Sequence, residues 1–197
     1  MLQSGQSYSE QTFKNQKFDL QELRSSEFHG CTFKRCTFVE ASLVDCRFVE
    51  CIFSNCDLSL AKIRGSAWIG VRFERSKLVG INWAEADWPD LRLGEPPTFQ
   101  DCALNHSTFL GLSLSGARFI NSTLIGVDFR EADLGQADFS GSDLLESLFL
   151  HTDLSDANLS TARNYTIAPA ENTLKKARFA LPEALSLLYN LNIVLED

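Results

Sequence analysis

Six cysteines and three histidines are the residues of this chain with the clearest potential for metal binding or nucleophilic chemistry. The cysteines are Cys31, Cys36, Cys46, Cys51, Cys56 and Cys102. The histidines are scattered along the chain, at His29, His106 and His151. We find no nucleophile–base constellation, no metal-ligand spacing and no glycine-rich phosphate loop. We therefore expect a protein that is not an enzyme, with no catalytic residue, metal site, cofactor or small-molecule substrate.

Carboxylates outnumber basic residues chiefly in the second half of the chain, which carries most of the net charge of −8. Residues 1–90 hold eleven Lys and Arg against twelve Asp and Glu, and residues 91–197 hold seven against fourteen. Between Phe119 and Ser160 the only basic residue is Arg130. The acids of the same segment are Asp128, Glu131, Asp133, Asp138, Asp143, Glu146, Asp153 and Asp156.

Two interpretations of this acidic segment remain open. Acids at these positions favour a turn and keep a surface hydrated, which is a purely structural role. Alternatively, they form a negative patch that binds the basic surface of a protein. The same negative charge would be repelled by phosphates, so we do not expect this protein to bind nucleic acid.

The element that must position these acids follows from a large apolar residue that recurs every five positions. These central residues are Phe, Leu, Ile or Trp, and they run from Phe13 to Leu93 and then, after one extra residue, from Phe99 to Leu159. A period of five matches neither a helix nor a flat strand. A fixed short period over most of a chain is typical of a solenoid.

The residue two places before each centre is small or modestly apolar, and all six cysteines occupy this position. One bulky and one small residue per five can both point inward only if the chain turns a corner in every repeat. Four corners make a square coil of twenty residues, and strand spacing stacks the coils about 4.8 Å apart. The residue just before each centre must then point outward.

Stacking of the coils places Cys31 on Cys51 and Cys36 on Cys56, near enough for a disulfide. The first eleven residues are polar and lack the apolar core of a signal peptide, and no segment is apolar enough to span a membrane. We therefore expect a cytoplasmic protein without membrane association. In that compartment the thiols stay free and act as small apolar filler.

The pattern resembles the pentapeptide-repeat family, whose consensus is A(D/N)LXX. The closest matches are VDFRE at 127–131, ADLGQ at 132–136, ADFSG at 137–141 and ANL at 157–159. The resemblance covers roughly residues 8 to 160. It implies an all-β fold, a right-handed quadrilateral parallel β-helix. We place this β-helix at residues 1–160, with a register break at 94–98.

The five-residue pattern ends after Leu159, and the remaining segment, 161–197, is expected to form a short helical cap and dimerisation module. Leu174–Phe179 reads as a short amphipathic helix, and Pro182 suits the first position of a second one. More apolar residues follow than a cap needs, which indicates an interface. We expect a homodimer joined tail to tail through Leu181, Leu185, Leu188, Tyr189, Leu191, Ile193 and Leu195.

The tail also carries a narrower resemblance. Asn164-Tyr165, the segment 174–184 and Leu191-Asn192-Ile193 look like the C-terminal module of topoisomerase-protecting pentapeptide proteins. These are the quinolone-resistance, microcin-immunity and albicidin-resistance proteins, and the segment 80–89 looks most like the last. The resemblance implies a dimeric DNA mimic that binds bacterial DNA gyrase, with topoisomerase IV as a further candidate, and protects it from a topoisomerase poison. The acids of segment 119–160 would replace phosphates. The alternative is a structural or adaptor solenoid that binds another protein.

Overall fold

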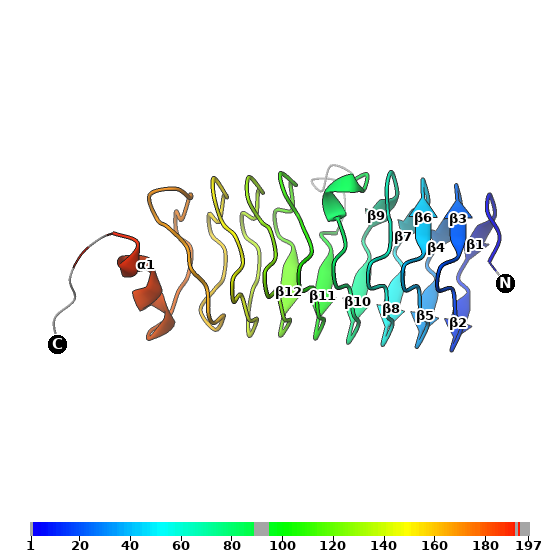
Figure 1. Ribbon diagram of the computed structural model, residues 1–197, viewed down its shortest axis with the longest axis horizontal. Helices are drawn as coiled ribbons and strands as arrows, with labels where there is room; N and C mark the ends of the chain where they lie inside the picture. The colour runs from blue at the N-terminus through cyan, green and yellow to red at the C-terminus, as the bar shows by residue number, and fades with distance from the viewer. Residues whose placement is uncertain (1, 89–94, 192, 194–197) are drawn as a thin grey trace.

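The computed structural model describes residues 2–88, 95–191 and 193. The chain winds into a rod of stacked coils, with β1 near one end and α1 at the other (Figure 1). Every strand pairing is parallel, between one coil and the next. The predicted parallel β-helix is thus confirmed.

Each coil has four sides, which we call faces 1 to 4 in chain order from Phe13. Face 1 carries the longest sheet, with the order β12-β11-β10-β8-β5-β2. Its strands are β2 (Thr12–Lys14), β5 (Thr32–Lys34), β8 (Ile52–Ser54), β10 (Arg72–Glu74), β11 (Thr98–Gln100) and β12 (Arg118–Ile120). Face 4 carries the sheet of β1 (Ser7–Ser9), β4 (Glu27–His29), β7 (Arg47–Val49) and β9 (Ala67–Ile69).

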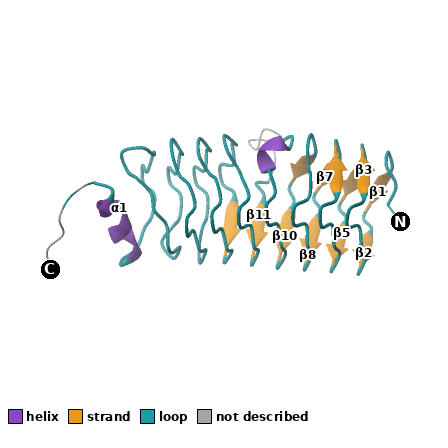
Figure 2. Ribbon diagram, in the orientation of Figure 1, coloured by secondary structure: helices purple, strands orange, loops and turns teal. Residues whose placement is uncertain are grey.

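Face 3 begins with the two-stranded sheet of β3 (Glu22–Arg24) and β6 (Ser42–Val44). Face 2 is held together by single-residue bridges, of which Lys17 to Thr37 is the first. The described strands lie toward the N-terminal end of the rod (Figure 2). Beyond β12 the coils continue through further parallel bridges, such as Asp133 to Asp153.

The twenty-residue register follows directly from the five-residue pattern. Phe33 lies opposite Phe13 on one side and Phe53 on the other. Because like residues stack on like, their rings lie parallel, with centroids 4.9 and 4.6 Å apart. Rings on neighbouring faces meet edge to face, as Phe28 and Phe33 do with their centroids 5.6 Å apart. The core is therefore a column of aromatic contacts that runs along the rod.

The corners require a left-handed backbone at the residue two places after a centre. Asn15 and Arg35 adopt φ values of 52° there, and Gly65 adopts 67°. Gly65 meets an additional constraint, because a Cβ on it would lie 2.3 Å from Oδ1 of Asp45 on the preceding coil. The Asp45 side chain therefore covers Gly65 on the next coil.

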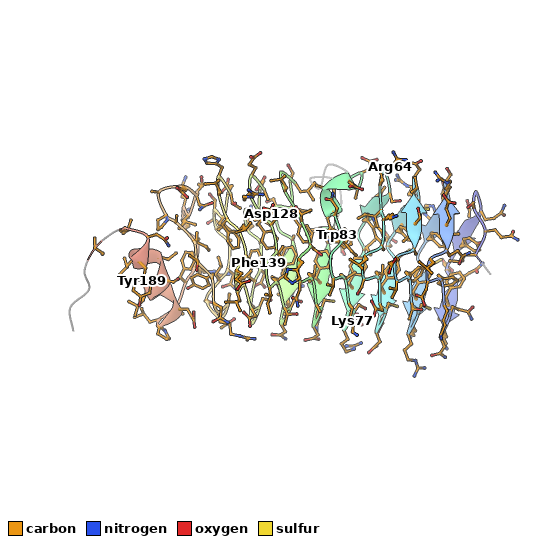
Figure 3. The ribbon with its side chains drawn as sticks, in the orientation of Figure 1. Arg64, Lys77, Trp83, Asp128, Phe139 and Tyr189 are labelled. Carbon is orange, nitrogen blue, oxygen red and sulfur yellow. The ribbon has the colours of Figure 1, made fainter. Side chains whose placement is uncertain are left out.

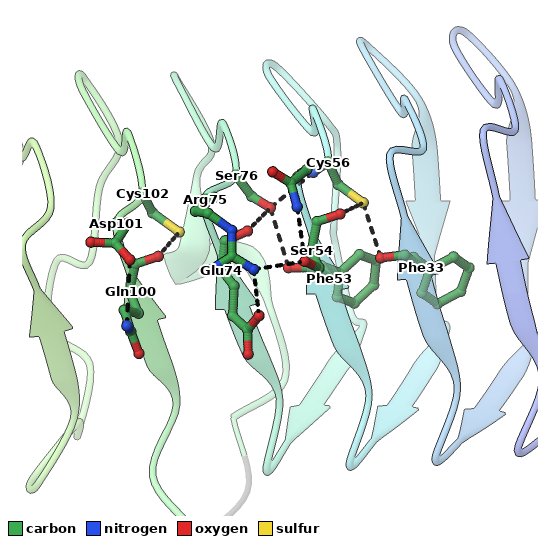
Figure 4. A network of polar contacts seen from close by, with 11 residues as sticks. Phe33, Phe53, Ser54, Cys56, Glu74, Arg75, Ser76, Gln100, Asp101 and Cys102 are labelled. Atoms are coloured by element: carbon green, nitrogen blue, oxygen red, sulfur yellow. Dashed lines mark hydrogen bonds and ion pairs between the residues drawn. The ribbon is translucent and has the colours of Figure 1, made fainter.

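The six cysteines are buried and free, as the sequence predicted. The Sγ atom of Cys56 lies 3.3 Å from the carbonyl oxygen of Phe33, and that of Cys102 lies 3.3 Å from the carbonyl oxygen of Gln100 (Figure 4). Ser76 stands between them in the same inward column and donates from Oγ to the carbonyl of Phe53 at 3.2 Å. Thiols and hydroxyls therefore fill one kind of position, in which each meets a backbone carbonyl.

The interruption is larger than the one extra residue expected from the sequence. Phe73 lies opposite Phe99, a separation of 26 residues where other coils have twenty. Trp88 is the last centre before the break, and Phe99 follows it by eleven positions instead of five, so six residues are inserted. Leu93, counted as a centre from the sequence, lies outside the described residues, as does residue 94 of the expected 94–98 break.

The tail differs from the expected pair of helices. Thr173 bridges to Asp153 and Arg178 bridges to Asn158, so the coils continue past residue 160. The segment 174–179 is part of a coil, with its turn at Lys176 (φ 59°), and the prediction of a helix there is wrong. Its apolar residues follow the five-residue spacing. Helix begins after Pro182, as the 3-10 helix η3 (Glu183–Leu185) and then α1 (Ser186–Tyr189).

Candidate protein-binding surface

The eight acids predicted to bind a partner do not share one face. The chain moves to the next face every five residues. Acids that precede successive centres therefore lie on different faces of the coil. Asp128 lies on face 3, Asp138 on face 1 and Asp143 on face 2. Asp133 and Asp153, separated by twenty residues, both lie on face 4 and bridge to each other.

Three of the acids are engaged within the rod. Arg130 donates from Nε and Nη2 to Asp128 at 2.9 and 2.7 Å, and these hydrogen bonds lower the pKa of that carboxyl. Arg163 forms an ion pair with Asp143 at 3.2 Å. Burial opposes ionisation of Asp138, but hydrogen bonds from Ser140 and Asn158 outweigh it and leave its pKa lowered.

Four acids gather on face 4 and its two corners, and we call them the acidic face: Glu131, Asp133, Asp153 and Asp156. Glu131 and Asp156 are exposed corner residues with φ values of 60° and 58°. Asp133 and Asp153 accept hydrogen bonds from the backbone N–H groups of their own turns, at 3.0 and 2.8 Å. Within the described part of the chain, none of the four has an ion-pair partner.

The remaining predicted acid, Glu146, turns the corner between faces 2 and 3 and lies outside the acidic face. Conversely, restricting the prediction to residues 119–160 missed acids on the same side of the rod. Glu131, His151 and Glu171 occupy the same corner on three successive coils. Asp87 extends face 4 toward the N-terminal half, next to Ala67. The twenty-residue spacing in the sequence would have identified Glu171, but the six-residue insertion displaces Asp87 from that spacing.

The expected dimerisation residues are largely exposed at the C-terminal end of the rod. Leu181 is 76% exposed and Tyr189, on α1, is 69% exposed (Figure 3). Leu185, Leu191 and Ile193 are also exposed, and Leu188 is half-buried. Leu195 lies outside the described residues. Leu187 packs against the core and so attaches α1 to the end of the solenoid.

In the ranges that the structure describes, no group of three His, Cys, Asp or Glu side chains could hold a metal ion. Nor does any helix in those ranges have the length and hydropathy needed to cross a lipid bilayer. The chemistry of the surface is therefore that of its charges, hydrogen-bonding groups and exposed apolar side chains.

The repeat architecture is shared with known proteins. The model of the pentapeptide repeat region matches residues 8–83 and 83–159, so the chain belongs to the pentapeptide-repeat family. No curated protein matches the chain.

Solved structures show the same fold. A trypsin-treated form of QnrB1, a plasmid-mediated fluoroquinolone resistance protein, is 18% identical, with a TM-score of 0.58 over 98% of this chain and 100% of that one. HetL, from the cyanobacterium Nostoc sp. strain PCC 7120, is involved in the regulation of heterocyst differentiation. It is 17% identical, with a TM-score of 0.53 over 90% of this chain and 87% of that one.

Proposed function

We propose that this protein is a DNA mimic that binds bacterial DNA gyrase and protects it from a topoisomerase poison, with topoisomerase IV as a further target. The role is one of binding, without a chemical reaction. The observation that carries the proposal is the acidic face, where four carboxylates lie on two adjacent coils without a described cation partner. Of the other acids in that segment, Asp128 and Asp143 are paired with Arg130 and Arg163, and Asp138 accepts hydrogen bonds from Ser140 and Asn158.

The shape of the rod supports the same proposal. Its coils repeat every 4.8 Å or so, and a turn of B-DNA spans about 34–36 Å. About seven stacked coils therefore span one turn of duplex DNA. A protein surface that binds such a turn through Lys and Arg side chains could bind the rod over the same length. Contacts of this kind are weakened by salt. The description of QnrB1 as a fluoroquinolone resistance protein agrees with this role.

A tail-to-tail dimer would double the acidic surface. Leu181, Leu185 and Tyr189 have exposed side chains and lie in or just before η3 and α1. These helices stand at the end of the rod from which a second copy could continue it (Figure 1). Burial of such side chains stabilises an association by about 25 cal/mol per Å² of apolar surface. A two-fold axis at this end would place one acidic face on each side of the dimer centre.

The test is binding of purified gyrase to the immobilised protein. The acidic-face variant carries Glu131→Gln, Asp133→Asn, Asp153→Asn and Asp156→Asn. Asn at positions 133 and 153 retains a side-chain oxygen that can accept the hydrogen bond of the turn, so the fold should persist. The control is Asp128→Asn with Asp143→Asn, which removes two charges that are already paired. We expect binding to be lost in the first variant and retained in the second. Unchanged binding in both would exclude this mechanism.

An adaptor that binds another protein is the second candidate, and exposed leucines favour it. Leu20 and Leu60 are 75% and 51% exposed at the corner between faces 2 and 3, two coils apart, with φ values of 58° and 60°. Leucine rarely occupies a left-handed corner, and apolar contacts anchor many protein interfaces. If Leu20→Asn with Leu60→Asn abolished recovery of a cellular partner while gyrase failed to bind the unmodified protein, the adaptor role would replace the first proposal.

A further inference from the structure

The near-neutral first half of the chain conceals a strong separation of charge across the rod. Between residues 5 and 88, faces 1 and 2 and the corner between them carry seven cations and three acids, a net charge of +4. The cations are Lys14, Lys17, Lys34, Arg35, Arg72, Arg75 and Lys77, and the acids are Asp19, Asp57 and Glu74. The other faces and corners carry four cations and eight acids, a net charge of −4. These cations are Arg24, Arg47, Lys62 and Arg64, and the acids are Glu10, Glu22, Glu27, Glu40, Asp45, Glu50, Glu85 and Asp87.

Part of this positive charge is neutralised by neighbours. Arg72 lies 2.9 Å from Glu95, Arg75 lies 3.1 Å from Glu74, and Lys77 lies 3.9 Å from Asp57. The cations of faces 1 and 2 in the first two coils differ, because no acid of the described residues lies within ion-pair distance of them. They are Lys14, Lys17, Lys34 and Arg35, which we call the cationic edge.

The cationic edge is built into the register of the rod. Lys14 of β2 and Lys34 of β5 are in-register partners on face 1, and both are exposed. Arg35 follows at the corner and Lys17 begins face 2. Like charges directly opposite on paired strands are destabilising. The folded chain therefore holds four cations close together, and no acid of the described residues forms an ion pair with any of them.

We propose that the cationic edge binds the phosphodiester backbone of duplex nucleic acid, independently of base sequence. A strand of B-DNA passes one phosphate per roughly 3.4 Å of its axis, and the coils repeat about every 4.8 Å. A duplex whose axis lies along the rod can therefore place phosphates of one strand beside both coils of the cationic edge. We expected from the sequence that this protein does not bind nucleic acid, because its net charge is −8. The cationic edge is locally positive, so that argument does not apply to it.

The neighbouring side chains fit phosphate better than they fit a protein. Thr12 and Thr32 are in-register beside the lysines, and Asn15 and Asn55 flank Arg35 at the corner. Hydroxyl and amide groups of this kind donate to phosphate oxygens. Protein interfaces instead centre on buried aromatic or apolar anchors. Faces 1 and 2 of these first two coils have no exposed large apolar side chain among the described residues, since Leu20 lies at the next corner.

The test is fluorescence anisotropy of a labelled 30-base-pair DNA duplex titrated with the full chain at 50 mM and 200 mM salt. Four phosphate contacts predict roughly a 10²-fold loss of affinity between the two concentrations. The edge variant is Lys14→Glu with Lys34→Glu. The control is Lys62→Glu with Arg64→Glu, which makes the same change of charge among the exposed residues of face 3. Arg64 and Lys77 lie on opposite edges of the rod (Figure 3).

We expect the edge variant to lose at least tenfold in DNA affinity at 50 mM salt and the control to stay within about threefold of the unmodified protein. A second variant, Lys14→Gln with Lys34→Gln, should also bind more weakly, and it avoids placing new acids on the rod. Absence of DNA binding at 50 mM salt, equal losses in edge and control variants, or stronger binding of poly-glutamate than of DNA would overturn the proposal. Topoisomerase is absent from the assay, so its outcome is independent of the proposed gyrase binding.

Discussion

Asp133 and Asp153 lie directly opposite each other on adjacent coils of face 4, and each accepts a hydrogen bond from the backbone N–H two residues further on. Two carboxylates in this arrangement repel each other. Each carboxylate is hydrogen-bonded to the backbone of its own turn, but neither forms an ion pair within the described chain. The acidic face is therefore a site where the fold tolerates an electrostatic cost that a cationic partner would remove.

Neutralising one of these acids should stabilise the isolated protein. Asp133→Asn keeps a side-chain oxygen for the turn and removes the repulsion with Asp153, so we expect a gain of about 0.2–1 kcal/mol in the free energy of unfolding. The gain should shrink at high salt, because exposed charges are screened. Chemical denaturation at low and high salt measures it. A loss of stability in Asp133→Asn would show that the acid is needed for the turn itself.

Acid should destabilise the rod through its engaged carboxylates. The pKa values of Asp128, Asp138 and Asp143 are lowered from the ordinary value of 3.8. A lowered pKa contributes stability above the unfolded value, and this contribution disappears as the pH falls through the folded value. We expect the free energy of unfolding to decline below about pH 4. The decline should be shallower in Asp128→Asn with Asp143→Asn, and an equally steep decline would contradict this assignment.

The corner glycines offer a matched test of backbone strain and crowding. Gly65 and Gly111 share a φ of +67°, but a Cβ would meet Asp45 at Gly65 and nothing within 4 Å at Gly111. Gly111→Ala should cost about 1–2 kcal/mol, from the left-handed backbone alone. Gly65→Ala should cost more, because the Asp45 side chain must move. Thermal unfolding measures both costs, and the difference should vanish in an Asp45→Ala background. Equal costs in the unmodified background would show that Asp45 moves freely.

The inward cysteines should be replaceable by serine where the column already contains serine. In Cys56→Ser the hydroxyl can donate to the carbonyl of Phe33, as Ser76 does to that of Phe53. We expect the free energy of unfolding to change by no more than about 1 kcal/mol. Phe119→Ala, which opens a cavity between four stacked or edge-on rings, should cost about 3–5 kcal/mol and serves as the comparison. A large loss in Cys56→Ser would mean that its thiol packs as a hydrophobe.

The five-residue spacing predicted the coil, its register and the inward cysteines, because sterics leave a chain with that period few other ways to bury its centres. It failed at the insertion, since Leu93 kept the spacing by chance while the pairing of Phe73 with Phe99 skips six residues. It failed again at 174–179, where amphipathic residues fit a helix and a coil equally well. Partners such as Arg130 for Asp128 lie two residues away. Even so, the sequence does not reveal which acids remain unpaired, because that depends on rotamers and on the neighbouring coil.

The most direct test of the central claim is DNA supercoiling by gyrase in the presence of a quinolone, and then of albicidin, with increasing amounts of this protein. We expect the unmodified protein to restore supercoiling against one of the two drugs. The Asp128→Asn with Asp143→Asn control should also restore it, whereas the acidic-face variant of Glu131, Asp133, Asp153 and Asp156 should not. If neither drug is countered and gyrase is not inhibited at high protein concentration, the protein is not a gyrase-binding DNA mimic.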